Sequence, residues 1–155
     1  MPKSPSILQS FAFLPRVGVF SCGLFFLAAT GCVKQIAYSP NEGLVEKNNV
    51  EAGGSRLEET LSRAIAPQIA SAEVTAETLR YEWTQTYLGP FYQPVTTQHS
   101  AQIFFKNIAR IELYENHKVF VWENNNRHYE IQFPGPEDAK EFADRVMSFR
   151  RNAIE

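Results

Sequence analysis

The carboxyl-terminal half of the chain alternates apolar and polar residues in several short segments. The alternation covers residues 102–106, 109–114, 119–123 and 128–133. A period of two is typical of strands that bury one face. Asparagine-containing turns at 115–118 and 124–126 separate the last three segments, and asparagine tolerates the positive φ of tight hairpins. These segments therefore predict antiparallel strands joined in a meander.

An amphipathic helix is predicted to follow the strands. Gly135 and Pro136 suit its first positions, and Glu137 and Asp138 in the first turn complement the helix dipole. Its apolar face consists of Ala139, Phe142, Ala143, Val146 and Phe149. The pattern predicts an α+β fold, with an antiparallel meander sheet or partial barrel capped by this C-terminal helix.

A second helix is predicted before the sheet, over residues 56–72. Leu57, Leu61, Ile65 and Ile69 recur every four residues on one helical face. Ser55 with Glu58 three residues later forms a candidate capping box, and Pro67 would kink or end the helix near Ala66.

The next segment predicts one strand and a loop rich in glycine and proline. Leu79, Tyr81 and Trp83 alternate with polar residues. In the loop, residues 87–97, we single out Tyr87, Phe91 and Tyr92 as candidate partner-binding residues. An aromatic residue in such a loop either folds back to complete the core or faces a partner, and both alternatives stay open at this point.

Residues 103–149 carry a further combination of motifs. Ile108 and Ile111 form an Ile-x-x-Ile rhythm, Tyr129, Ile131 and Phe133 an aromatic-x-Ile-x-Phe strand, and Asp138 to Phe142 an acidic-Ala-x-x-Phe helix. In this order they resemble the second half of a pleckstrin-homology-like domain. The N-terminal half departs from that family, because it predicts one firm strand where a complete domain has several.

The resemblance implies a ligand whose chemistry can be compared with the residues present. Phosphoinositide-binding members neutralise phosphates with Lys and Arg in the loop after the first strand. The corresponding stretch, residues 81–101, contains neither. We therefore expect no phosphoinositide binding. The formal net charge of −2 likewise argues against nucleic acid as a partner.

The amino-terminal segment has the organisation of a secretory signal peptide. Lys3 and Arg16 are its only charged residues, and residues 17–30 form an uncharged, mostly apolar run. This run is shorter than the roughly 20 residues of a membrane-spanning helix.

Ala29, Thr30, Gly31 and Cys32 close the run and resemble the lipobox of bacterial lipoproteins. In that family small residues fit the peptidase, and the cysteine thiol takes the lipid and becomes the new N-terminus. The resemblance implies fatty acids such as palmitate on Cys32. The first box position is usually Leu and here is Ala29. A plain signal peptide cleaved nearby and an uncleaved anchor are the alternatives.

These features predict a signal peptide over residues 1–31, a flexible tether over 32–55 and one α+β domain over 56–152. The tether has few apolar residues and contains Gly53 and Gly54, so it cannot bury enough apolar surface to order itself.

The residue after Cys32 is Val33 rather than Asp. The resemblance to bacterial lipoproteins therefore implies that the protein lies on the periplasmic face of the outer membrane.

No motif for catalysis is found in the sequence. His99, His117 and His128 are not spaced with a second His or Cys as in a zinc site. No thiol stays free once Cys32 is acylated, because Cys22 lies in the expected signal peptide. The sequence contains no Gly-x-Ser-x-Gly and no phosphate-binding glycine loop. We expect no enzyme activity, no metal and no cofactor.

The expected function is that of a lipid-anchored bacterial envelope protein that acts as a non-catalytic binding or interaction module. Its expected partners are the membrane, through the lipid, and an envelope protein. The alternatives are a small-ligand carrier or accessory enzyme subunit, and a purely structural lipoprotein. A carrier requires a sizeable apolar pocket, whereas an interaction module requires a filled core and an exposed loop patch.

Overall fold

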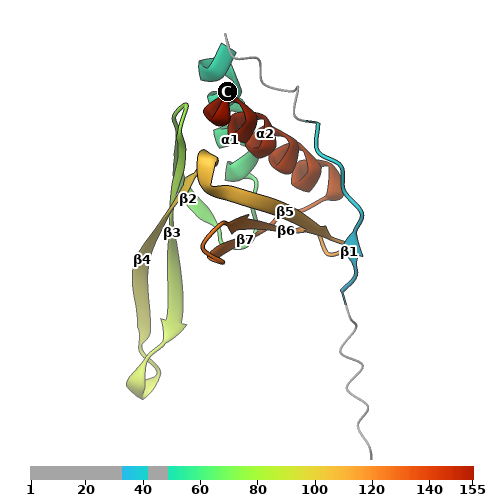
Figure 1. Cartoon of the computed structure of the whole chain (residues 1–155). Helices are drawn as coiled ribbons and strands as arrows, with labels where there is room; N and C mark the ends of the chain where they lie inside the picture. The colour runs from blue at the N-terminus through green and yellow to red at the C-terminus, as the bar shows by residue number, and fades with distance from the viewer. Residues whose placement is uncertain (1–32, 42–48) are drawn as a thin grey trace, which may run out of the picture. The chain divides into compact units, whose positions relative to one another are not determined.

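Two antiparallel sheets and two α-helices make up the part of the chain that the computed structural model describes, residues 33–41 and 49–155. The four-stranded sheet has the order β1 (Gln35–Ile36), β5 (Ile108–Tyr114), β6 (Lys118–Glu123) and β7 (His128–Gln132). The three-stranded sheet has the order β2 (Ile69–Val74), β3 (Thr78–Leu88) and β4 (Pro94–Phe104). Neither sheet closes into a barrel among the described strands. The predicted α+β class and the β5–β6–β7 meander are confirmed (Figure 1).

The C-terminal helix, α2 (Pro136–Ile154), follows Gly135 as predicted and lies against the four-stranded sheet (Figure 1). Its predicted apolar face is buried. Phe142 packs on Phe133 with ring centroids 5.1 Å apart, and Phe149 stacks on Phe105 at 4.9 Å. Burial of each such side chain stabilises the fold by roughly 1.5–3 kcal/mol.

Both sheets and both helices contribute to one core. Its largest fully buried side chains are Phe105, Phe133, Phe142, Phe149, Leu57, Leu61, Leu79, Ile103, Ile108, Ile131, Val119 and Val121. The described residues therefore form one folded domain, which belongs to a compact unit spanning Cys32–Glu155.

The first helix, α1 (Val50–Ser62), begins earlier than predicted. Ser55 is not its cap; the Ser55 hydroxyl donates to the carbonyl oxygen of Glu51 at 3.3 Å, inside the helix. Gly54 is buried against β2, since a Cβ at this position would lie 3.5 Å from the Cβ of Val74. Packing against β2 thus outweighs the low helix propensity of the two glycines.

The helix also ends earlier than predicted. Leu57 and Leu61 are buried, but Ile65 is 55% exposed and Ile69 belongs to β2. After Ser62 the backbone turns to β7, where the Ile65 amide donates to the carbonyl oxygen of Gln132 at 2.8 Å. The predicted helical face is therefore wrong beyond Leu61, because backbone hydrogen bonds to β7 replace the helical ones.

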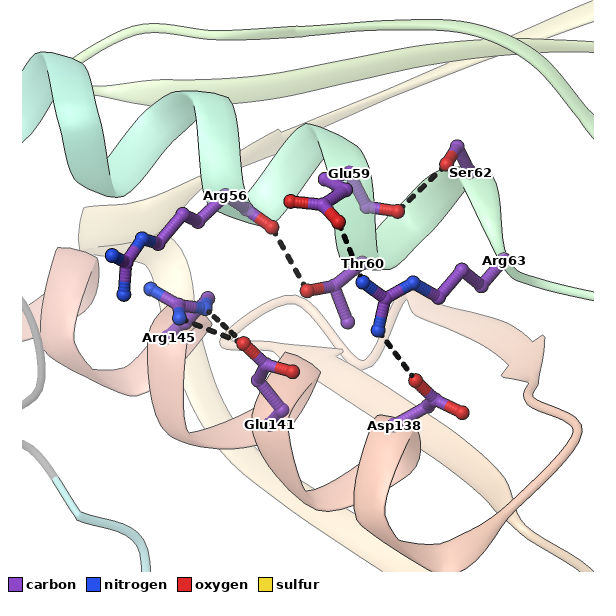
Figure 2. Close-up of polar contacts among 8 residues, drawn as sticks. All are labelled: Arg56, Glu59, Thr60, Ser62, Arg63, Asp138, Glu141 and Arg145. Atoms are coloured by element: carbon purple, nitrogen blue, oxygen red, sulfur yellow. Dashed lines mark hydrogen bonds and ion pairs between the residues drawn. The ribbon is translucent and has the colours of Figure 1, made fainter.

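Charged side chains connect the two helices at one end. Arg63, directly after α1, pairs with Glu59 at 2.6 Å and reaches Asp138 of α2 at 3.0 Å (Figure 2). Within α2, Arg145 is almost buried and pairs with Glu141 at 2.7 Å. These pairs place ionic contacts beside the apolar contact between the helices.

Residues 33–41 pack on the domain rather than forming a free tether. The Glu115 amide donates to the carbonyl oxygen of Lys34 at 3.0 Å, and β1 continues this pairing along β5. Further along, the Tyr38 hydroxyl and the Asn41 amide both donate to the carboxylate of Asp144 on α2.

These contacts, together with the start of α1 at Val50, correct the expectation that the whole stretch 32–55 is flexible. Residues 33–41 pack on the domain despite their low apolar content, because backbone pairing and hydrogen bonds to the buried Asp144 carboxylate need few apolar residues. Residues 42–48, Cys32 and the predicted signal peptide lie outside the described residues.

Candidate functional site

A long hairpin of β3 and β4 replaces the short strand and loop that the sequence predicts. The two strands pair continuously from Thr78 with Phe104 to Leu88 with Pro94. The predicted loop over 87–97 is therefore wrong for most of its length. Val95 and the threonines after it favour a strand, and Pro94 can begin an edge strand at little cost because it lacks an amide hydrogen.

The outer half of the hairpin is paired only with itself among the described strands. β2 follows β3 from Leu79 as far as Trp83, and beyond that point β4 is the one neighbour of β3. At about 3.4 Å per residue, the five further residue pairs extend roughly 17 Å. In Figure 1 this half of the hairpin continues past the packed parts of both sheets.

Side-chain contacts across the strands stiffen this outer half. The rings of Trp83 and His99 stack across the strands with centroids 5.3 Å apart, and His99 Nε2 lies 2.8 Å from the hydroxyl of Thr97 on its own strand. Nearer the tip, the hydroxyls of Thr86 and Thr96 lie 2.9 Å apart. Such cross-strand pairs each contribute about 0.2–1 kcal/mol, and they hold the tip at a defined distance from the core.

The turn at the tip, η2 (Pro90–Tyr92), places two aromatic residues in a backbone conformation that favours glycine or asparagine. The φ angles are 66° at Phe91 and 58° at Tyr92. For residues with a Cβ, this left-handed region costs roughly 1–2 kcal/mol each. The turn is nevertheless closed by two backbone bonds, from the Gly89 amide to Gln93 at 2.8 Å and from the Tyr92 amide to Gly89 at 3.2 Å.

The structure brings the three predicted partner-binding residues together at this tip and exposes them. Tyr87 is 49% exposed, Phe91 91% and Tyr92 87%. The alternative that Phe91 and Tyr92 complete the core is therefore wrong. Leu88, 70% exposed, joins them, and sequence analysis missed it. The sequence feature that could have indicated Leu88 is its position as an apolar residue directly before Gly89 and Pro90. We call Tyr87, Leu88, Phe91 and Tyr92 the tip cluster.

A second aromatic cluster lies on the face of the four-stranded sheet opposite α2. Glu112 accepts hydrogen bonds from Arg110 at 2.7 Å, from Trp122 at 3.0 Å and from the Tyr114 hydroxyl at 3.3 Å. Desolvation alone would raise the pKa of Glu112, but these donors and the positive charge of Arg110 outweigh it, so the pKa is lowered. The Arg110 guanidinium also lies 4.6 Å from the ring centre of Trp122. The Glu112 carboxylate thus holds these side chains together on the sheet.

An open groove of about 370 Å³ lies between the two sheets. It is lined by Ala66, Pro67, Tyr81, Trp83, His128, Tyr129 and Glu130. Tyr129 donates to the backbone oxygen of Gln102 at 2.7 Å, and His128 packs against Trp122 with ring centroids 4.5 Å apart. The Tyr129 hydroxyl and the His128 ring thus make contacts within the fold, and the groove is open rather than an enclosed volume such as a carrier pocket has.

The three histidines that the sequence analysis considered lie in different segments of the described structure. His99 is stacked on Trp83, His128 packs against Trp122 with its ring tilted by 36°, and His117 occupies a turn at φ 60°. Among residues 33–41 and 49–155 no group of three or more His, Cys, Asp and Glu side chains could hold a metal ion. Within the same ranges, no helix has the length and apolar character needed to cross a membrane.

Comparisons of the chain with protein-family models, curated proteins and solved structures found no match. The resemblances to bacterial lipoproteins and to the pleckstrin-homology-like superfamily stay predictions from the residues that carry them. The candidate site is therefore defined by its own geometry, and the tip cluster is its centre.

Proposed function

We propose that this protein is a bacterial envelope lipoprotein, anchored through Cys32, whose domain is a non-catalytic binding module that uses the tip cluster. The lipobox-like residues 29–32 support the anchor. A thiol directly after an uncharged apolar run is placed for acylation and poorly placed for a core. We assign the anchor to the periplasmic face of the outer membrane.

The observation that carries the binding role is the exposure of two aromatic residues in left-handed backbone. Phe91 and Tyr92 gain no burial in the domain, and their φ angles favour smaller residues. Neither packing nor turn geometry accounts for them. An exposed apolar patch on a rigid support is typical of a surface that contacts a protein or a membrane.

The two alternative functions have weaker support. A ligand carrier would use the groove near Trp83. That groove is open, and the Tyr129 hydroxyl that lines it already donates to the backbone oxygen of Gln102. A purely structural lipoprotein would not need apolar side chains at the end of a hairpin, where they lower solubility.

The anchor is tested by replacing Cys32 with Ser. The intact protein should carry an acyl mass and fractionate with membranes, whereas Cys32→Ser should lose both. A Cys32→Ser variant that keeps its lipid excludes Cys32 as the attachment site.

The binding role is tested by photo-crosslinking in cells. A photoreactive phenylalanine analogue is placed at Phe91, and the same analogue at Ile154, which is 60% exposed at the end of α2, serves as the control. We expect adducts to lipid or to protein from position 91 well above those from position 154. Equal yields at the two positions would contradict a binding role for the tip cluster.

A further inference from the structure

The outer part of the hairpin carries no charged side chain. No Asp, Glu, Lys or Arg occurs from Trp83 to Phe105, and His99 is the one histidine of that stretch. Moving an ion into a low-dielectric medium is costly, and natural edge strands usually carry charges that oppose pairing. This hairpin can therefore enter an apolar environment without desolvating an ion.

The backbone of the tip is also suited to a medium that offers few hydrogen bonds. Pro90 and Pro94 have no amide hydrogen, and the amides of Gly89 and Tyr92 donate within the turn. Backbone donors left unpaired in hydrocarbon cost several kcal/mol each. Two amides therefore donate within the turn and two residues have no amide hydrogen. Between Tyr87 and Val95, Gln93 is the one residue with a polar amide side chain, and the Thr86 and Thr96 hydroxyls, further from the turn, lie 2.9 Å apart.

The side chains of the tip cluster match the boundary between lipid headgroups and acyl chains. Leu88 and Phe91 are wholly apolar, and Tyr87 and Tyr92 combine an apolar ring with a hydroxyl. Tyrosine is enriched at the membrane–water interface because one end of the ring is apolar and the other polar.

The start of the domain holds it close to the residue that would carry the anchor. The Lys34 carbonyl accepts from the Glu115 amide directly after β5, and β1 pairs with β5. Cys32 is two positions before Lys34 in the sequence, a separation that the chain can span with at most about 7 Å. In Figure 1 β1 and the tip of the β3–β4 hairpin both lie lower in the view than α1 and α2. A domain held so closely presents this side to the bilayer.

We propose that the tip cluster inserts into the same leaflet that holds the lipid on Cys32 and forms a second, non-covalent membrane attachment. The inference rests on the proposed anchor. The ligand is the interfacial region of a phospholipid bilayer, without a requirement for a particular headgroup, because the tip has no Lys or Arg to contact phosphates. The anchor raises the effective concentration of the tip at the surface, so a weak insertion suffices to fix the orientation of the domain.

Tryptophan quenching in proteoliposomes tests this insertion. The intact lipidated protein is reconstituted in phosphatidylcholine vesicles with or without phosphatidylcholine brominated in its acyl chains. Phe91→Trp is compared with Gln98→Trp, an exposed position near the base of the outer hairpin. Emission of the unsubstituted protein, which contains Trp83 and Trp122, is subtracted from both.

Insertion predicts that the added emission in Phe91→Trp shifts to shorter wavelength and is mostly quenched by the brominated lipid, while that of Gln98→Trp is not. Adding phosphatidylglycerol or salt should change neither result. Equal quenching at the two positions, or none at position 91, overturns the insertion. If position 91 is unquenched yet crosslinks to a protein in cells, the binding role stands and its partner is a protein. If it neither quenches nor crosslinks, the binding role fails as well.

Discussion

At the scale of single residues, the lowered pKa of Glu112 ties the stability of the domain to pH. Its carboxylate holds Arg110, Trp122 and Tyr114 together on the open face of the sheet. A folded-state pKa below the unfolded value means that the ionised form stabilises the fold. That contribution is present above a pH of about 4.5 and is lost as the pH falls toward the folded-state pKa.

We predict that Glu112→Gln lowers the free energy of unfolding by about 1 kcal/mol at pH 7. The value is modest because glutamine still accepts one hydrogen bond and Arg110 is half exposed. The difference from the wild type should shrink as the pH falls below about 4.5. Urea denaturation across pH measures it, with Glu73→Gln on the exposed face of β2 as the control. A difference that grows at low pH contradicts the assignment.

At the scale of elements, α2 is the helix on which the core depends. Phe142 is fully buried against Phe133, so Phe142→Ala should lower the free energy of unfolding by about 3–5 kcal/mol. Ile154→Ala, at an exposed position on the same helix, should have little effect. Chemical denaturation of the two variants separates burial from helix propensity, and equal losses would mean that Phe142 is not a core residue.

Replacing a glycine by alanine should have opposite effects at Gly54 in α1 and at Gly89 before the hairpin turn. A Cβ at Gly54 would make ordinary contact with Val74, so Gly54→Ala should stabilise α1 by roughly 0.5–1 kcal/mol. A Cβ at Gly89 would lie 2.7 Å from the Cγ2 of Val95, so Gly89→Ala should displace the turn. Gly54→Ala should raise the midpoint of thermal unfolding. Gly89→Ala should speed hydrogen exchange at the amide of residue 89. Stabilisation of the tip by Gly89→Ala is the result that would contradict this account.

Elements with one clear period could be predicted from the sequence. α2 and the three strands before it have turn residues at both ends, and their buried faces repeat every 3.6 or every two residues. β2 could not be predicted, because Ile65 and Ile69 continued the four-residue spacing of Leu57 and Leu61. The backbone hydrogen bonds to Gln132 that end this spacing come from residues far along the chain.

The candidate site was only partly predictable for a related reason. Glycine and proline among aromatic residues indicate a turn, and that turn exists. Whether its rings point into the core depends on how far β2 supports the hairpin. That limit is set at Trp83 by pairing in space, which no local pattern encodes. Leu88 was overlooked because it is exposed for the same reason.

At the scale of the whole molecule, the residues that stabilise the fold are separate from the tip cluster, which we propose binds a membrane. The core is filled by side chains from both sheets and both helices, and the tip cluster contributes nothing to it. Sites that serve a partner often run against local structural preference, and the fold compensates elsewhere. Here the local cost is the left-handed backbone at Phe91 and Tyr92, and the cross-strand contacts of the hairpin offset it.

This separation predicts that the tip can be made more stable and less functional by the same change. Asparagine tolerates left-handed backbone better than Phe or Tyr, so Phe91→Asn with Tyr92→Asn should leave the free energy of unfolding unchanged or raise it by up to about 1 kcal/mol. With the aromatic rings gone, the photoreactive group at Leu88 should lose most of its adducts, while the lipid on Cys32 and membrane fractionation persist. Ile154→Asn should change neither adducts nor stability by a comparable amount, since it too replaces an exposed apolar side chain. Unfolding of the double variant would contradict this prediction. The replacement relieves backbone strain, so a loss of stability would mean that the Phe91 and Tyr92 side chains stabilise the fold.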